Sequence, residues 1–168
     1  VYDDFLDTVR RDRDEFITSF ASKFSTDRGY LAPMQAAIQD ALKQAGLTSQ
    51  KISKAVLTSP DKRAHLQLAK KLGVPDGQVQ DVFFNDIGFA GTAMPLVLLI
   101  AALESAAPGD VILVAASGNG ADALVFRVTE NIKNRCPYKE LKLHVGFGDP
   151  WHPALMLKRL EADAPVLL

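Results

Sequence analysis

The chain has 168 residues, of which 48% are apolar and 23% are charged, as in an ordinary globular domain. Its 19 basic and 20 acidic residues balance to a formal net charge of -1, which gives no basic surface for nucleic acid. A single cysteine rules out an internal disulfide and fits a reduced, cytoplasmic setting. The longest apolar run, residues 93–103, is too short to span a bilayer. Because the chain starts at Val1, we expect a processed chain or a piece of a longer protein.

Residues 1–29 form the first predicted region, a helical lead-in. Apolar side chains recur among charges over residues 1–24, which favours one or two helices, and residues 25–33 indicate a loop. Pro33 is suited to the first turn of the next helix. Apolar residues then repeat at helical spacing, and Gly46 is suited to end that helix.

Residues 54–59 read as a short buried strand, followed by a helix. Ser59 is a candidate N-cap with Pro60 in the first turn, and Gly73 would end the helix after Leu72. Residues 82–84 suggest a second short strand.

Residues 92–106 are apolar on all sides, which predicts a helix buried on all sides. Two strands are expected at residues 111–116 and 123–128, and the short turn between them makes them antiparallel neighbours. The alternation of helix and strand predicts an α/β domain over residues 30–132, with a mixed sheet flanked by helices. Residues 133–168 are expected to form an irregular tail with a short helix.

The turn contains Gly118, Asn119 and Gly120 in a pattern that fits the G-x-G-x-x-A form of the dinucleotide-binding fingerprint. That fingerprint needs a helix after the glycines, so that the pyrophosphate meets the helix N-terminus. The residues that follow favour a strand. A nucleotide site and a tight turn between two strands are both open at this point.

Other reactive side chains give weaker signals. His65, His144 and His152 have no metal-ligand spacing, so no metal site is expected, and His65 is expected on a helix surface. Cys136 reads as an incidental thiol, although its basic neighbour would lower its pKa. Lys62 and Arg63 open a predicted helix, where they are either a phosphate contact or solvated first-turn charges.

The order of segments from residue 30 to 132 resembles the C-terminal half of HMG-CoA synthases and, more distantly, of beta-ketoacyl-ACP synthase III. The resemblance is carried by AVLTSPDKRAHLQLAKKLGV, by NDIGFAGTAMPLVLLIAALESAAPGDVILVAASGNGADALVFRVTENI and by the helix that ends in KQAGL. It is greatest for bacterial and archaeal forms associated with an OB-fold zinc-ribbon domain. The resemblance implies a thiolase-like half, which pairs with a cysteine-bearing N-terminal half in a condensing acyltransferase.

The catalytic positions of this family depart from its pattern here. The resemblance places Thr58 at the position of the family histidine and Phe89 at that of the family asparagine, with Met94 at a serine position. Threonine does not titrate near neutral pH, and phenylalanine donates no hydrogen bond to a thioester or enolate oxygen. The cysteine half has no counterpart in this sequence, and Cys136 lies outside the matched region. No catalytic set is therefore expected to be intact.

Two features of the family are retained. The resemblance implies that Arg63, with Lys62, lies near the phosphates of coenzyme A, and that the turn of Gly118, Asn119 and Gly120 lies near the acyl thioester. It implies no cofactor beyond the coenzyme A thioester itself. The expected partners are the cysteine-bearing half in the same or another chain, an OB-fold zinc-ribbon protein, and further copies in a dimer. The alternatives are a pseudoenzyme that serves as a structural or acyl-CoA-binding subunit, and a nucleotide-binding α/β domain.

Overall fold

The computed structural model describes residues 1–134 apart from residues 4, 6–7, 20–21 and 86. All described elements lie in the unit Val1–Cys136. The tail predicted over residues 133–168 falls almost wholly outside the described residues, as do Cys136, His144 and His152. Within the described part, no helix has both the length and the apolar character needed to cross a membrane.

The centre of the fold is a three-stranded mixed sheet of β3 (Lys54–Leu57), β4 (Val111–Gly118) and β5 (Gly120–Arg127). The strand order is β3-β4-β5, with β3 parallel to β4 and β4 antiparallel to β5. The predicted mixed sheet, with its last two strands antiparallel, is confirmed.

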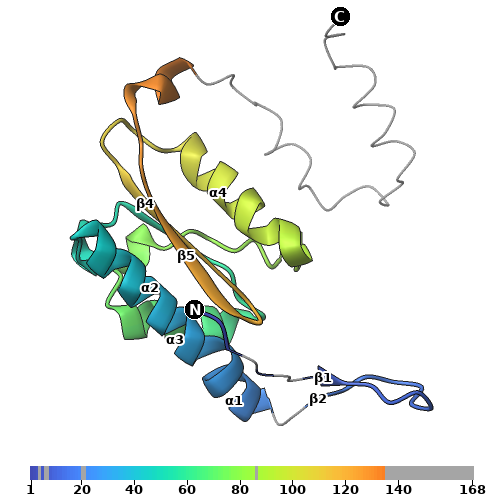
Figure 1. The fold of residues 1–168 in the computed structure, drawn as a ribbon. Coiled ribbons are helices and arrows are strands. Elements are labelled where there is room, and N and C mark those ends of the chain that lie inside the picture. Colours follow the sequence, from blue (N-terminus) through green and yellow to red (C-terminus); the bar gives the residue numbers. More distant parts are fainter. Residues whose placement is uncertain (4, 6–7, 20–21, 86, 135–168) are drawn as a thin grey trace, which may run out of the picture. The chain divides into compact units, whose positions relative to one another are not determined.

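Helices cover both faces of this sheet. Figure 1 shows α2 (Ala32–Ala45) and α3 (Lys62–Leu72) on one side and α4 (Met94–Glu104) on the other. The predicted ends of α2 and α3 are confirmed, because Gly46 and Gly73 take left-handed C-cap conformations with φ of 64° and 65°. An L side chain at either position would be strained.

Two apolar clusters hold the layers together, one on each face of the sheet. Strand alternation sends Leu57, Leu113 and Ala115 toward α2 and α3, and sends Val56, Ile112 and Val114 toward α4. Leu113 and Ile112 are both fully buried, so the central strand contributes to both clusters. The remaining members of the second cluster are Val82, Met94, Leu98, Ala102 and Val128.

Helix α4 is buried on one side only in the described part of this chain. Met94, Leu98 and Ala102 repeat at helical spacing and are at most 1% exposed. Leu96 and Ile100 point away from them and are 64% and 45% exposed. The sequence prediction of burial on all sides therefore holds for the inner face alone, because nothing among the described residues covers the outer face.

The expected helical lead-in over residues 1–29 is wrong over most of its length. The structure has two short antiparallel strands, β1 (Thr8–Val9) and β2 (Thr18–Ser19), and only then helix α1 (Ser22–Phe24). The loop expected at residues 25–33 is also wrong. Ser25–Leu31 is helical with the wider π spacing and runs directly into α2.

The strand expected at residues 82–84 does not form. Phe83 has a φ of +52°, which no strand residue adopts, and its N–H donates a hydrogen bond to the nearby Asp81 carboxylate at 3.2 Å. The chain meets the sheet earlier, where Val79 forms an isolated parallel bridge with Ala55. The apolar residues at 82–84 pack against the α4 side of the core without pairing.

Candidate functional site

The carboxyl ends of β3 and β4 meet at one edge of the sheet, called here the carboxyl edge. Leu57 pairs with Ala115, and the Thr58 N–H then donates to the Ala115 carbonyl oxygen at 3.0 Å. From Ala115, β4 continues to Gly118, where the turn into β5 begins. Thr58 and the glycine turn therefore lie at the same edge of the sheet, although the sequence separates them widely.

Thr58 is fixed by three hydrogen bonds to two residues, Ala115 and Tyr30. Its hydroxyl donates to the Ala115 carbonyl at 3.4 Å, and its own carbonyl accepts from the Tyr30 hydroxyl at 2.9 Å. Its side chain is 5% exposed. A buried hydroxyl that is already bonded to backbone, and that does not ionise near pH 7, cannot move protons for a reaction.

Tyr30 is a buried contact of this edge that the sequence did not reveal. Burial raises the pKa of the Tyr30 hydroxyl above its usual range, while a side-chain interaction with Ser59 opposes that rise. Tyr30 therefore stays a neutral donor. It holds the backbone at Thr58. The sequence gives no periodic signal at Tyr30, because residues 25–33 have the composition of a loop.

His65 is buried, not on the surface as its helix position suggested. It lies in α3 with 4% exposure, and its Nδ1 atom has no hydrogen-bond partner among the described residues. Burial lowers the pKa of His65, while a backbone hydrogen bond with Leu57 and the charge of Asp81 oppose that shift. The ring is therefore held neutral at pH 7.

The folded state should lose stability on mild acidification because of His65. The unfolded chain takes up a proton near pH 6.5 while the folded chain does not, so the free energy of unfolding falls as pH drops below 6.5. One proton limits the fall to about 1.4 kcal/mol per pH unit. Urea denaturation at pH 7.5 and at pH 5.5 measures this fall in the free energy of unfolding. His65→Leu should show a smaller difference between the two pH values, and an equal difference would assign the pH dependence to other groups.

The first turn of α3 carries the two candidate phosphate contacts, Lys62 and Arg63, which are both exposed. The predicted N-cap at Ser59 is wrong. Asp61 is the N-cap, and its carboxylate accepts from the Ala64 N–H at 2.8 Å, whereas the Ser59 hydroxyl donates to the Asp61 carbonyl. Because the carboxylate already occupies the helix N-terminus, a phosphate here would be held by the two cationic side chains.

The glycine turn is tighter than the sequence indicated. Ser117 pairs with Ala121 and Gly118 with Gly120, which leaves only Asn119 at the tip. Gly120 has a φ of +102°, in the region that favours glycine. Strand β5 follows at once. The dinucleotide fingerprint is therefore ruled out as an explanation of these glycines, because the helix it requires is replaced by a strand.

Phe89 and Met94 occupy different environments. Phe89 is 59% exposed in the segment before α4, while Met94 opens the helix and is 1% exposed. Met94 belongs to the cluster that contains Val56 and Val114, so it is a core residue of this lobe. Neither side chain offers a hydrogen-bond donor.

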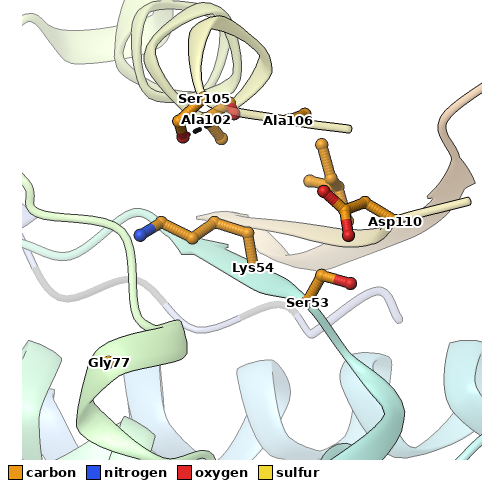
Figure 2. Close-up of a pocket in the computed structure, with 8 residues that line it drawn as sticks. Ser53, Lys54, Gly77, Ala102, Ser105, Ala106 and Asp110 are labelled. Carbon is orange, nitrogen blue, oxygen red and sulfur yellow. Dashed lines mark hydrogen bonds between the residues drawn. The ribbon is translucent and has the colours of Figure 1, made fainter. Parts of the chain in front are cut away.

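The cavity at the opposite end of the sheet does not make a second site. It has a volume of about 230 Å³ and lies between the amino ends of β3 and β4 and the end of α4, as Figure 2 shows. Its polar groups serve the fold: the Ser105 hydroxyl donates to the Ala102 carbonyl at 3.2 Å, and the Asp110 carboxylate accepts from the Ala107 N–H at 2.7 Å. The Lys54 side chain also lines this cavity.

No group of His, Cys, Asp and Glu within the described residues is arranged to hold a metal ion.

Comparison with protein families gives a match over about half of the chain. The sequence pattern described as "3-Oxoacyl-[acyl-carrier-protein (ACP)] synthase III C terminal" matches residues 42–128, which include β3, β4, β5, α3, α4 and most of the carboxyl edge.

Similar sequences include two archaeal hydroxymethylglutaryl-CoA synthases. The enzyme of Methanopyrus kandleri is 30% identical over 149 residues, which cover 83% of this chain and 42% of that protein. The enzyme of Aeropyrum pernix is 29% identical over 140 residues, which cover 77% of this chain and 39% of that protein. The chain thus spans about two fifths of the length of these relatives.

Solved structures of the same fold include the 3-oxoacyl-[acyl-carrier-protein] synthase III of Aquifex aeolicus, with a TM-score of 0.60 at 21% identity over 69% of this chain and 38% of that one. An HMG-CoA synthase complexed with CoA gives a TM-score of 0.61 at 17% identity, over 84% of this chain and 40% of that one. These likenesses establish a thiolase-like fold.

Proposed function

The chain belongs to the family of 3-oxoacyl-[acyl-carrier-protein] synthase III C-terminal domains, and from this premise we propose that it is the C-terminal lobe of an acyltransferase of the HMG-CoA synthase type that acts on acyl-CoA thioesters. As a thiolase-like condensing-enzyme domain related to HMG-CoA synthase, it has the fold of such a lobe. In this proposal the lobe is not catalytically complete. A cysteine-bearing lobe, in the same polypeptide or in another subunit, supplies the nucleophile.

The outer face of α4 carries this proposal. Leu96 and Ile100 expose large aliphatic side chains on a helix whose opposite face is fully packed. A helix that is apolar on all sides is normally buried on all sides, because burying each aliphatic side chain stabilises the fold by about 1.5–3 kcal/mol. We assign the outer face to the cysteine-bearing lobe, since the chain spans only about two fifths of its relatives. The assembled protein would have α4 in its interior.

The carboxyl edge supports a role in thioester binding. Lys62 and Arg63 present exposed cations at the first turn of α3, where phosphates of coenzyme A could be held. The glycine turn brings the exposed backbone of Gly118 and Asn119 to the same edge, with room above Gly118, whereas Gly120 is buried. A backbone N–H near Asn119 would face the thioester oxygen.

A second function is favoured by the apolar substitutions. The Thr58 hydroxyl already donates a hydrogen bond to backbone, and the side chains of Phe89 and Met94 have no hydrogen-bond donor. A lobe with these residues suits a pseudoenzyme that binds acyl-CoA or stabilises an active subunit, in a cytoplasmic dimer or in a complex with an OB-fold zinc-ribbon protein. Acyl transfer without an enolate would need neither missing group, so thioester binding is common to both functions.

Isothermal titration calorimetry with CoA, acetyl-CoA and NAD tests the proposal. CoA and acetyl-CoA should bind, and NAD should not. Arg63→Ala should weaken CoA binding by about 10-fold, because a charge-assisted contact with phosphate is worth about 1.5–3 kcal/mol before solvent screening reduces it.

Two variants of α3 serve as controls for this titration. Lys71→Ala removes the same charge from the last turn of the helix and should leave the affinity unchanged. Asp61→Asn keeps a good N-cap while removing the carboxylate, and should strengthen CoA binding. Equal affinities for the parent and Arg63→Ala would end the phosphate assignment. NAD binding without CoA binding would end the proposed function.

A further inference from the structure

Strand β3 presents its backbone groups alternately to its two sides. Successive residues of a strand direct their N–H and C=O groups to opposite neighbours. Thr58 bonds toward β4, where its N–H donates to the Ala115 carbonyl at 3.0 Å. Ala55 bonds away from β4, because its carbonyl accepts from the Gln80 N–H at 2.8 Å. Leu57 follows Ala55 by two residues, so the Leu57 carbonyl also faces away from β4.

The segment that runs beside β3 leaves the sheet before it reaches Leu57. Val79 forms an isolated parallel bridge with Ala55, and the positive φ of Phe83 then turns the backbone away. Within the described residues, none of the N–H groups of residues 81–84 donates to β3. Leu57 is fully buried, and a buried carbonyl that lacks a partner destabilises a fold. Its carbonyl therefore needs a donor from elsewhere in the chain.

The imidazole of His65 supplies that donor. The ring forms a hydrogen bond with the Leu57 backbone, and this bond by itself raises the pKa of the ring, against the larger effect of burial. A bond that raises the pKa favours the protonated ring, in which both nitrogens are donors. The ring therefore donates to the Leu57 carbonyl. Because His65 is 4% exposed, the bond lies in the core, where water does not replace it.

The bond between His65 and Leu57 joins two parts of the carboxyl edge. His65 lies one turn after the N-cap of α3, and its backbone N–H donates to the Asp61 carbonyl at 3.1 Å. Lys62 and Arg63 lie in the turn between these two residues. Leu57 is the last residue of β3. One side chain thus connects the helical turn that carries the two cations to the end of the strand beside the glycine turn.

We propose that His65 is a positioning residue of the carboxyl edge, whose neutral imidazole holds the end of β3 and the first turn of α3 in the arrangement that binds a coenzyme A thioester. The inference rests on the proposed function for its ligand. His65 acts from the core and not by touching the ligand, because its side chain is almost wholly buried. Its effect on binding passes through the backbone of Leu57 and the two cations of α3.

Mild acid is expected to loosen this connection. The segments around His65 carry Asp61, Lys62 and Arg63 in the first turn of α3, Asp81 beside β3, Tyr30 before α2, and the exposed Asp40 and Lys43 in α2. Burial lowers the pKa of His65, the charge of Asp81 opposes that shift, and Nδ1 has no hydrogen-bond partner among the described residues. A solvated ring takes up a proton below pH 6.5 whereas the buried ring resists it. Release of the ring should therefore be about tenfold more favourable at pH 5.5 than at pH 7.5.

Two variants of His65 test the inference at pH 7.5. His65→Leu removes the donor and keeps an apolar side chain, whereas His65→Gln keeps an N–H donor that does not titrate. Hydrogen exchange of assigned amides is followed by NMR, and CoA binding is followed by calorimetry. In His65→Leu the Thr58 amide should exchange about tenfold faster, since the adjacent Leu57 carbonyl loses its partner. CoA should bind at least about threefold more weakly, because the binding arrangement becomes only a fraction of the population.

His65→Gln is the conservative variant and should keep both the Thr58 exchange rate and the CoA affinity near those of the parent at pH 7.5. The amide of Val128 is the internal control, because it bonds to the Asp110 carbonyl at the other end of the sheet and should change less than the Thr58 amide in His65→Leu. The pH profile separates the two donors. Between pH 7.5 and pH 5.5 the protection of the Thr58 amide should fall about tenfold further in the parent than in His65→Gln, because only the parent carries the titrating ring.

Four results would overturn the inference. They are a parent-like Thr58 exchange rate in His65→Leu, equal acceleration of the Thr58 and Val128 amides, the same pH profile in the parent and His65→Gln, and unchanged CoA affinity in His65→Leu. Equal acceleration would assign His65 to general stability alone. CoA titration of the parent reports separately on the proposed function. If the parent binds no CoA, that function is refuted, while the Thr58 exchange rates still decide whether His65 holds the end of β3.

Discussion

Leu98→Ala is expected to lower the free energy of unfolding by about 2–5 kcal/mol. Leu98 is fully buried on the inner face of α4 and packs in the cluster that contains Val56 and Ile112. Removing one methine and two methyl carbons leaves a cavity that the two β-branched neighbours cannot fill. Urea denaturation followed by circular dichroism measures the change. For a lobe of this size, the loss is a large share of the whole stability.

Leu96→Ala is the matched control for this prediction, because it makes the same substitution on the opposite face of the same helix. Leu96 is 64% exposed, so its truncation should change the stability of this chain by less than about 0.5 kcal/mol. In the assembled condensing protein the same substitution should lower the stability markedly, since the second lobe would cover Leu96. Equal losses for the two variants in the isolated chain would show that α4 is already covered on its outer face.

Gly120→Ala is expected to destabilise the chain by about 1–3 kcal/mol from backbone strain alone. Gly120 has a φ of +102°, and a Cβ atom there would overlap the backbone of Val1 and Asp3. Relief of that overlap requires Val1 to leave Ala121, so the two hydrogen bonds between them should break as well. Thermal unfolding measures the stability, and the amide exchange rate of Ala121 reports the lost pairing.

Gly118→Ala provides the comparison for Gly120→Ala. Gly118 lies on the other side of Asn119 in the same turn, and a Cβ atom there meets no heavy atom within 4 Å. The Gly118→Ala variant should therefore be about as stable as the parent chain. If both variants were equally mild, the close approach of Val1 and Asp3 to Gly120 would be wrong, and with it the pairing of Val1 with Ala121.

Local sequence signals predicted the elements whose ends depend on single residues. Gly46 and Gly73 end α2 and α3 because a left-handed C-cap needs a residue without Cβ. The apolar runs at residues 54–57 and 111–118 form strands because they are buried between two layers of helices. Hairpin pairing of β4 and β5 followed from the short turn alone.

The predictions that failed depended on contacts between distant residues. The apolar pattern before residue 25 is compatible with a helix and with a strand. Pairing of Thr8 with Ser19 makes this segment two antiparallel strands. Phe83 lies in an apolar run typical of a strand, but the bridge of Val79 to Ala55 placed the sheet contact earlier in the chain. His65 has the spacing of a helix surface residue, and the packing of α3 against the sheet buried it.

The sequence by itself determined the chemistry that the candidate site can offer, since Thr58, Phe89 and Met94 carry no titratable group in any fold. It also determined the two cations at the start of α3 and the glycines of the turn. Only the tertiary structure decided which of these residues lie close together. Parallel pairing of β3 with β4 places the carboxyl ends of the two strands side by side, although more than fifty residues separate them in the sequence. The exposed outer face of α4 was likewise decided by packing, since an apolar pattern predicts that a surface is covered but does not say which neighbour covers it.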